Sequence, residues 1–81
     1  MIAAVAVCRD GEIAPTMDFA PGIELYRRLE DGWKPAGSLN GAEGGMEALL
    51  VGNLRSRGVE AVVCGGISRA LLWMLTESGI W

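Results

Sequence analysis

The sequence predicts one small α/β domain that spans residues 1–81. Short apolar runs typical of buried strands alternate with segments of helical periodicity, and glycine or proline separates most segments from the next. A chain of this length has room for a single thin core, because it buries only about 60–65% of the surface that it exposes when unfolded. The predicted order is β-β-β-α-β-α, with a mixed sheet in which a parallel strand joins an antiparallel meander.

Three strands are predicted in the N-terminal half. Residues 2–8 are rich in valine and alanine, which is typical of a strand covered on both faces. In residues 23–30 one parity is mostly apolar and the other polar, which indicates a strand with one face in water. An Asp-Gly turn follows, so residues 33–39 are expected to return as an edge strand, where Pro35 is tolerated.

A helix, a strand and a second helix are predicted in the C-terminal half. After a glycine-rich loop at residues 40–45, leucines at helical spacing predict the first helix. Residues 61–64 form a second buried strand, and Ser68 is the expected N-cap of a helix over residues 69–78. Residues 80–81 are typical of the start of another strand, which would pair in parallel. We therefore expect a truncated C-terminal strand and an exposed edge on the fourth strand.

Charge and hydropathy narrow the class of protein. Ten acidic and seven scattered basic residues give a net charge of −3, which argues against a nucleic-acid partner. No apolar stretch is long enough to span a membrane, and no basic region precedes the apolar N-terminus, so a cytoplasmic protein is expected. Hydrophobic residues make up 51% of the chain, and this excess, together with the exposed strand edge, predicts a homo-oligomer.

Several short motifs follow one another in a characteristic order. In the C-terminal half they are the glycine-rich loop, a helix, the Gly-Val, apolar-strand and Gly-Gly-Ile run of residues 58–67, and a helix ending in Gly79 and Ile80. In the N-terminal half a first strand and an Asp-Gly turn are followed by the Phe-Ala-Pro-Gly run of residues 19–22. Over essentially the whole chain, this ordered set resembles the dinitrogenase iron–molybdenum cofactor biosynthesis family.

The resemblance carries expectations about fold and function. It implies a ribonuclease H-like fold and a non-enzymatic accessory role, namely the binding or carriage of a metal–sulfur cluster of the iron–molybdenum type used in nitrogen fixation. The partner would be an apo-metalloenzyme or a cluster donor protein. The chain departs from the family where Asp18 stands in place of a frequent histidine and Ser68 in place of a frequent glycine.

Cys8 and Cys64 are the candidate metal ligands. Each ends a predicted strand, and in the family's sheet order these strands are parallel neighbours, so both thiols would lie at the carboxyl edge, where open sheets bind ligands. Two thiolates could hold a soft metal, the two thiols could close a disulfide, or each could pack as a small buried hydrophobe. The chain has no histidine, so a third ligand would come from Met17, Asp18 or a partner subunit.

A second candidate site is the turn before the second helix. Gly65, Gly66, Ser68 and Arg69 are the predicted cofactor-binding residues, because free N–H groups at a helix N-terminus attract anions such as a cluster. Simple turn chemistry is the alternative, and it is the favoured reading for the glycines at 44–45 before the first helix. Neither pair of glycines belongs to a P-loop.

The implied fold is shared with nucleases, so the carboxylates of the chain are candidate metal ligands. A two-metal nuclease needs several carboxylates converging on metals about 4 Å apart. We read Asp10, Asp18, Glu24 and Glu43 as solvated surface charges and do not expect an enzyme. The alternative to cluster binding is a metal-free oligomeric interaction or assembly module with the same fold.

Overall fold

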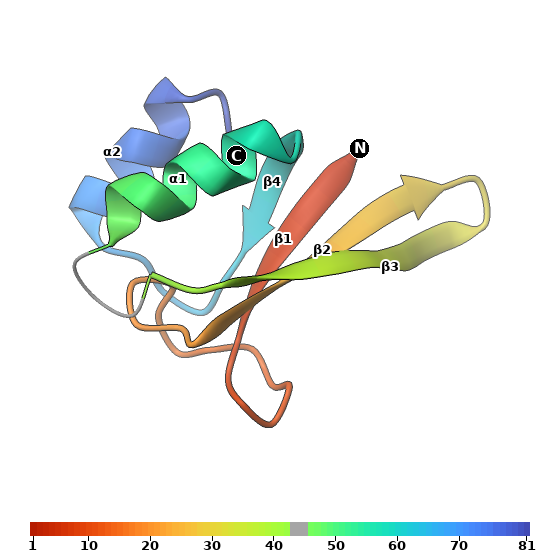
Figure 1. Ribbon diagram of the computed structural model, residues 1–81, viewed down its shortest axis with the longest axis horizontal. Coiled ribbons are helices and arrows are strands. Elements are labelled where there is room, and N and C mark those ends of the chain that lie inside the picture. The colour runs from red at the N-terminus through yellow and green to blue at the C-terminus, as the bar shows by residue number, and fades with distance from the viewer. Residues whose placement is uncertain (43–45) are drawn as a thin grey trace.

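The computed structural model describes residues 1–42 and 46–81, and it has the predicted order of elements. The elements are β1 (Ile2–Val7), β2 (Gly22–Leu29), β3 (Gly32–Asn40), α1 (Glu47–Ser56), β4 (Val59–Val63) and α2 (Arg69–Glu77) (Figure 1). The α/β class is therefore confirmed. Among the described residues, neither helix has the length and apolarity needed to cross a lipid bilayer.

The four strands form one mixed sheet in the order β3-β2-β1-β4. Strand β2 pairs in antiparallel fashion with both β1 and β3. Strands β1 and β4 form a parallel pair. The two central strands are thus β2 and β1, and α1 carries the chain from the β3 edge to the β4 edge. This arrangement confirms the predicted mixed sheet, with an antiparallel meander and one parallel pair.

Both helices pack on the same face of the sheet. Alternate residues of β1 and β2 point to this face and are almost fully buried, as period-2 alternation requires. They share one core with the buried leucines and valine of the helices; the cluster includes Ala4, Ala6, Ile23, Leu25, Leu50, Val51, Leu54, Leu71 and Leu75. The tip of the β2–β3 hairpin extends away from both helices (Figure 1), which explains why the ends of these strands are exposed.

The other face of the sheet is not covered by either described helix. Apolar and aromatic side chains from all four strands line a shallow hollow of about 360 Å³ there: Ala3, Val5, Tyr26, Trp33 and Val63. Trp33 and Val63 are each 47% exposed. The expectation that residues 2–8 are covered on both faces was therefore wrong for this face, because the helices that follow β3 and β4 both cross the opposite one.

The last two residues extend the sheet. The Trp81 N–H donates to the Glu60 carbonyl (2.9 Å), and the Trp81 carbonyl accepts from the Val62 N–H (2.6 Å), which is the bonding pattern of a parallel pair. Ile80 is buried among the core residues. The prediction that residues 80–81 begin a strand parallel to the fourth strand is confirmed.

Candidate functional site

The two cysteines lie at the same edge of the sheet, as the family resemblance implied. Cys8 directly follows β1 and Cys64 directly follows β4, and these strands are parallel neighbours. Both are free thiols, both are half-buried, and both pack against the core. Each cysteine therefore packs in part as a small hydrophobic residue, which is one of the alternatives that the sequence left open.

The backbone of Ala14 separates the ends of the two strands. Its N–H donates to the Ala6 carbonyl (2.8 Å), and its carbonyl accepts from the Gly65 N–H (3.2 Å). The register, which pairs Val5 with Val63, places Cys8 two residues beyond the level of Cys64. Two residues of strand rise and one strand spacing would already separate the two Cα atoms by about 8 Å, and the inserted Ala14 backbone increases this distance further beyond the reach of about 7 Å that a disulfide tolerates.

The surroundings of Cys64 disfavour a thiolate. Burial, and secondly the negative charge of Asp18, raise the pKa of the Cys64 thiol above its ordinary value of 9.0. A metal ion binding there would have to displace a proton that is held more firmly than usual. Within the described residues, no three histidine, cysteine or carboxylate side chains are grouped so that they could hold a metal ion. Met17, one of the third ligands considered, is completely buried in the core.

Asp18 is a buried helix-capping residue. It is only 7% exposed, and its carboxylate accepts hydrogen bonds from the Ser68 N–H (2.7 Å) and the Ser68 hydroxyl (2.5 Å). The Ser68 Oγ in turn accepts from the Leu71 N–H (3.1 Å), so the predicted N-cap is confirmed. The prediction that Asp18 is a solvated surface charge was wrong, because a negative charge is stabilised at the N-terminus of α2.

The Asp18 carboxylate occupies part of the predicted anion site at the N-terminus of α2. The Ser68 N–H, one of the donors expected to meet an anionic cluster, is already bonded to Asp18. A second anion at this end of α2 would be repelled by the Asp18 charge. Arg69 is exposed beside it and adds a positive charge at the surface. Side chains of the same chain, Asp18 and Ser68, therefore already accept hydrogen bonds from backbone N–H groups at the N-terminus of α2.

The glycines before α2 are explained by close backbone packing. A Cβ on Gly65 would lie 2.7 Å from the Ala14 carbonyl oxygen and 2.8 Å from that of Pro15, and one on Gly66 would lie 3.1 Å from the latter. The Gly66 carbonyl also accepts from the Met17 N–H (2.8 Å). These contacts favour turn chemistry at this pair. The predicted glycine pair at 44–45, and Glu43, lie outside the described residues.

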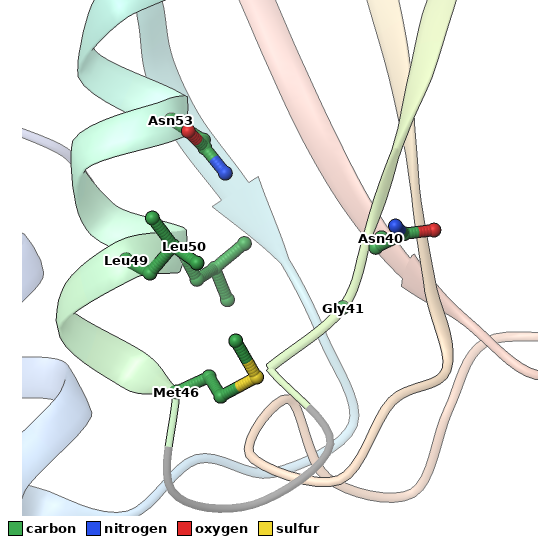
Figure 2. A pocket seen from close by; sticks show the side chains of 6 residues that line it. All are labelled: Asn40, Gly41, Met46, Leu49, Leu50 and Asn53. Carbon is green, nitrogen blue, oxygen red and sulfur yellow. The ribbon is translucent and has the colours of Figure 1, made fainter.

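A second hollow lies between the end of β3 and α1 (Figure 2). It measures about 340 Å³ and is lined by Asn40, Gly41, Met46, Leu49, Leu50 and Asn53. Figure 2 shows Met46 and Leu50 reaching from the helix side toward Gly41, which directly follows β3. Apart from two amides, the lining residues that the structure describes are apolar, and none of these described residues is an acid or a base.

The three described carboxylates among the candidate nuclease ligands lie in three different places. Asp10 accepts from the Glu12 N–H (3.1 Å) in an exposed turn, Asp18 caps α2, and Glu24 accepts from the Tyr26 hydroxyl (2.6 Å) on the open sheet face. Their positions do not form the convergent cluster that a two-metal mechanism needs. The prediction that the chain is not an enzyme stays a prediction.

Comparison of the chain with protein-family models, curated proteins and solved structures gave no match. The family resemblance therefore rests on the ordered motifs of the sequence. The surface that the sequence did not reveal is the open face around Trp33 and Val63. Its only sequence signal is that both parities of residues 2–8 and of residues 61–64 are apolar, which indicates an apolar surface without saying what covers it.

Proposed function

We propose that this chain is a metal-free oligomeric interaction module whose working surface is the open face of the sheet. The observation that carries the proposal is the apolar hollow that crosses all four strands. Apolar surface that joins several strands and stays open to water is typical of interaction sites. Covering this one stabilises the complex by about 25 cal/mol for each Å² of apolar surface removed from water.

The side chains of the open face suit a protein partner better than a small polar ligand. Tyr26 and Trp33 are aromatic residues of the kind enriched at the centres of interfaces, and they stand beside aliphatic Val5 and Val63. The Tyr26 hydroxyl is already bonded to Glu24. The face therefore offers contact area and shape more than free donors or acceptors.

A ribonuclease H-like fold is part of the proposal. The strand order β3-β2-β1-β4, followed by Trp81 pairing in parallel with the outer edge of β4, supports it. The sequence motifs that resemble the dinitrogenase iron–molybdenum cofactor biosynthesis family support the same fold. Fold alone does not establish activity, so the interaction surface carries the functional part of the proposal.

Carriage of a metal–sulfur cluster of the iron–molybdenum type is the second candidate. The observation that favours it is the placement of two free thiols, Cys8 and Cys64, at one sheet edge, since thiolates suit such clusters. The donor set of one chain fits a cluster poorly, because the Ala14 backbone lies between the strand ends that carry the thiols and Asp18 holds a negative charge near Cys64. Further ligands would have to come from a partner subunit, a cluster donor or an apo-metalloenzyme.

Sedimentation velocity over a range of concentrations tests the interaction module. We expect the wild type to associate reversibly and Val63→Lys to weaken association at least tenfold, because it places a charge in the apolar hollow. Leu72→Lys is the matched control, since Leu72 is similarly exposed but lies on α2, away from the open face. A wild type that stays monomeric up to about 1 mM, or a larger effect of the control, rejects the proposal.

Metal and sulfide analysis of protein purified and reconstituted without oxygen tests the second candidate. Stoichiometric metal in the wild type that is lost in a Cys8→Ser/Cys64→Ser double variant supports cluster carriage at this edge. Protein that takes up no iron, molybdenum or copper rules it out. Sedimentation of the same double variant provides the control, because the open face is unchanged in it.

A further inference from the structure

Two opposite charges flank Tyr26 on the open face. Glu24 and Arg28 lie two residues on either side of Tyr26 in β2, so strand alternation puts all three side chains on one face. The register agrees, since Tyr26 pairs with Ala3 of β1 and Arg28 pairs with Trp33 of β3, both of which line the hollow. The rim of the apolar surface therefore carries one acid and one base in a defined order.

These two charges do not neutralise each other within one chain. They are separated by four residues of extended strand, or about 13 Å. The ion pair that the structure shows among the described residues joins Lys34 to Asp31 at the hairpin tip (3.6 Å). Glu24 is held by the Tyr26 hydroxyl, which leaves the Arg28 guanidinium as a cation at the rim. A partner that covers the face would gain by matching both charges.

Symmetry allows a second copy of the chain to match them. A two-fold axis that lies between two facing sheets and runs perpendicular to β2 reverses the strand direction. It sets Glu24 of one copy opposite Arg28 of the other, twice, and places Tyr26 near its own equivalent. An axis parallel to β2 would instead set like charges against each other, which is unfavourable. Facing sheets pack about 10 Å apart, a gap that an arginine and a glutamate side chain can bridge together.

We propose that the open face is covered by a second copy of this chain, related by a two-fold axis near Tyr26, with two reciprocal Glu24–Arg28 ion pairs. This inference rests on the proposed function and names the partner and its orientation. The apolar centre around Val5 and Val63 supplies the contact area, and the ion pairs select the antiparallel orientation. An isologous contact of this kind closes as a dimer and leaves no further copy of the face exposed.

Charge reversal tests the arrangement. Glu24→Arg and Arg28→Glu each place like charges across the axis, so each variant alone should dimerise at least tenfold more weakly than the wild type by sedimentation velocity. The Glu24→Arg/Arg28→Glu double variant restores opposite charges and should dimerise within about threefold of the wild type. An equimolar mixture of the two single variants should form a heterodimer, which also shows that each variant is folded. Glu77→Arg, on α2, is the control for charge reversal elsewhere.

The outcomes separate this inference from the function on which it rests. Loss of dimer in both single variants, with recovery in the double variant and in the mixture, supports the antiparallel dimer. If Val63→Lys weakens association while the charge reversals leave it unchanged, the interaction module stands and this arrangement is overturned. Failure of both the double variant and the mixture to recover also overturns it. A wild type that is monomeric throughout rejects both.

Discussion

Asp18 and Ser68 lie 50 residues apart in the sequence and are joined by two hydrogen bonds. Both bonds have the Asp18 carboxylate as acceptor, with the Ser68 backbone N–H and hydroxyl as donors. The pair fastens the loop between β1 and β2 to the N-terminus of α2. The same loop also places Ala14 between the ends of β1 and β4, so this contact helps to hold the loop against the carboxyl edge of these two strands.

Replacing Asp18 by asparagine is expected to destabilise the protein by about 1.5–3 kcal/mol. The substitution removes the charge that strengthens both hydrogen bonds and turns an amide toward the donors of Ser68. Urea unfolding followed by far-ultraviolet circular dichroism measures the change. Asp10→Asn is the control, because Asp10 accepts a hydrogen bond only in an exposed turn, and it should stay within about 0.5 kcal/mol of the wild type. Equal losses would contradict the buried cap.

Local signals in the sequence predicted most of the fold. The Ser68 cap could be predicted because its partner, Leu71, is three residues away. The start of a parallel strand at residues 80–81 could be predicted because the preceding helix ends at a glycine, Gly79, and two apolar residues follow it. Asp18 could not be placed, because a carboxylate in a loop has the same local pattern whether it is solvated or capping a helix 50 residues further along.

Gly65→Ala is expected to cost about 1–3 kcal/mol of unfolding free energy. The new Cβ would lie under 3 Å from two backbone carbonyl oxygens, of Ala14 and Pro15, so the loop or the turn must move. Gly52→Ala, in the middle of α1, is the matched control, because nothing lies within 4 Å of its Cβ position. It should stabilise the protein by about 0.5–1 kcal/mol, since alanine is the better helix former. A neutral Gly65→Ala would reject close packing as the reason for the glycine.

The separation of the cysteines shows where sequence reasoning stops. The expectation that Cys8 and Cys64 lie at the same edge was correct, and it came from the sheet order of the resembled family, in which their strands are parallel neighbours. The sequence could not show that the Ala14 backbone inserts between them, since that insertion depends on hydrogen bonds to Ala6 and Gly65 from an irregular segment. A metal shared by both thiols would therefore require this segment to move aside.

The Cys64 thiol is expected to titrate above pH 9. In a Cys8→Ser variant, the rate of alkylation by iodoacetamide should follow the Cys64 thiolate and reach half its maximum above the ordinary value of 9.0, because burial and Asp18 raise the pKa. Adding Asp18→Asn should lower that midpoint, because it removes the negative charge of Asp18. A midpoint at or below 9.0 would contradict the structure.

The same pKa predicts how stability changes with pH. The unfolded chain loses its Cys64 proton first as the pH rises, because its pKa is the lower of the two. The stability contributed by keeping this thiol neutral is therefore fully present below pH 9 and is lost as the pH rises through the higher, folded pKa. A Cys64→Val variant should lose less stability over that range than the wild type in urea unfolding at alkaline pH.

The pKa of Tyr26 reports on the negative charge of Glu24, which the proposed dimer uses in its ion pairs. The hydrogen bond to Glu24, then burial, then the Glu24 charge raise the pKa of Tyr26 above its ordinary value of 10.0. Glu24→Gln removes the anion that accepts this hydrogen bond and should bring the pKa back toward 10.0. Tyr26 is the only tyrosine, so its ionisation can be followed by tyrosinate absorbance. The measurement belongs at a protein concentration low enough to keep the chain monomeric, so that the effect stays within one chain. Glu77→Gln, on α2, should leave the pKa unchanged, and equal values for the two variants would show that Glu24 is not the acceptor on the open face.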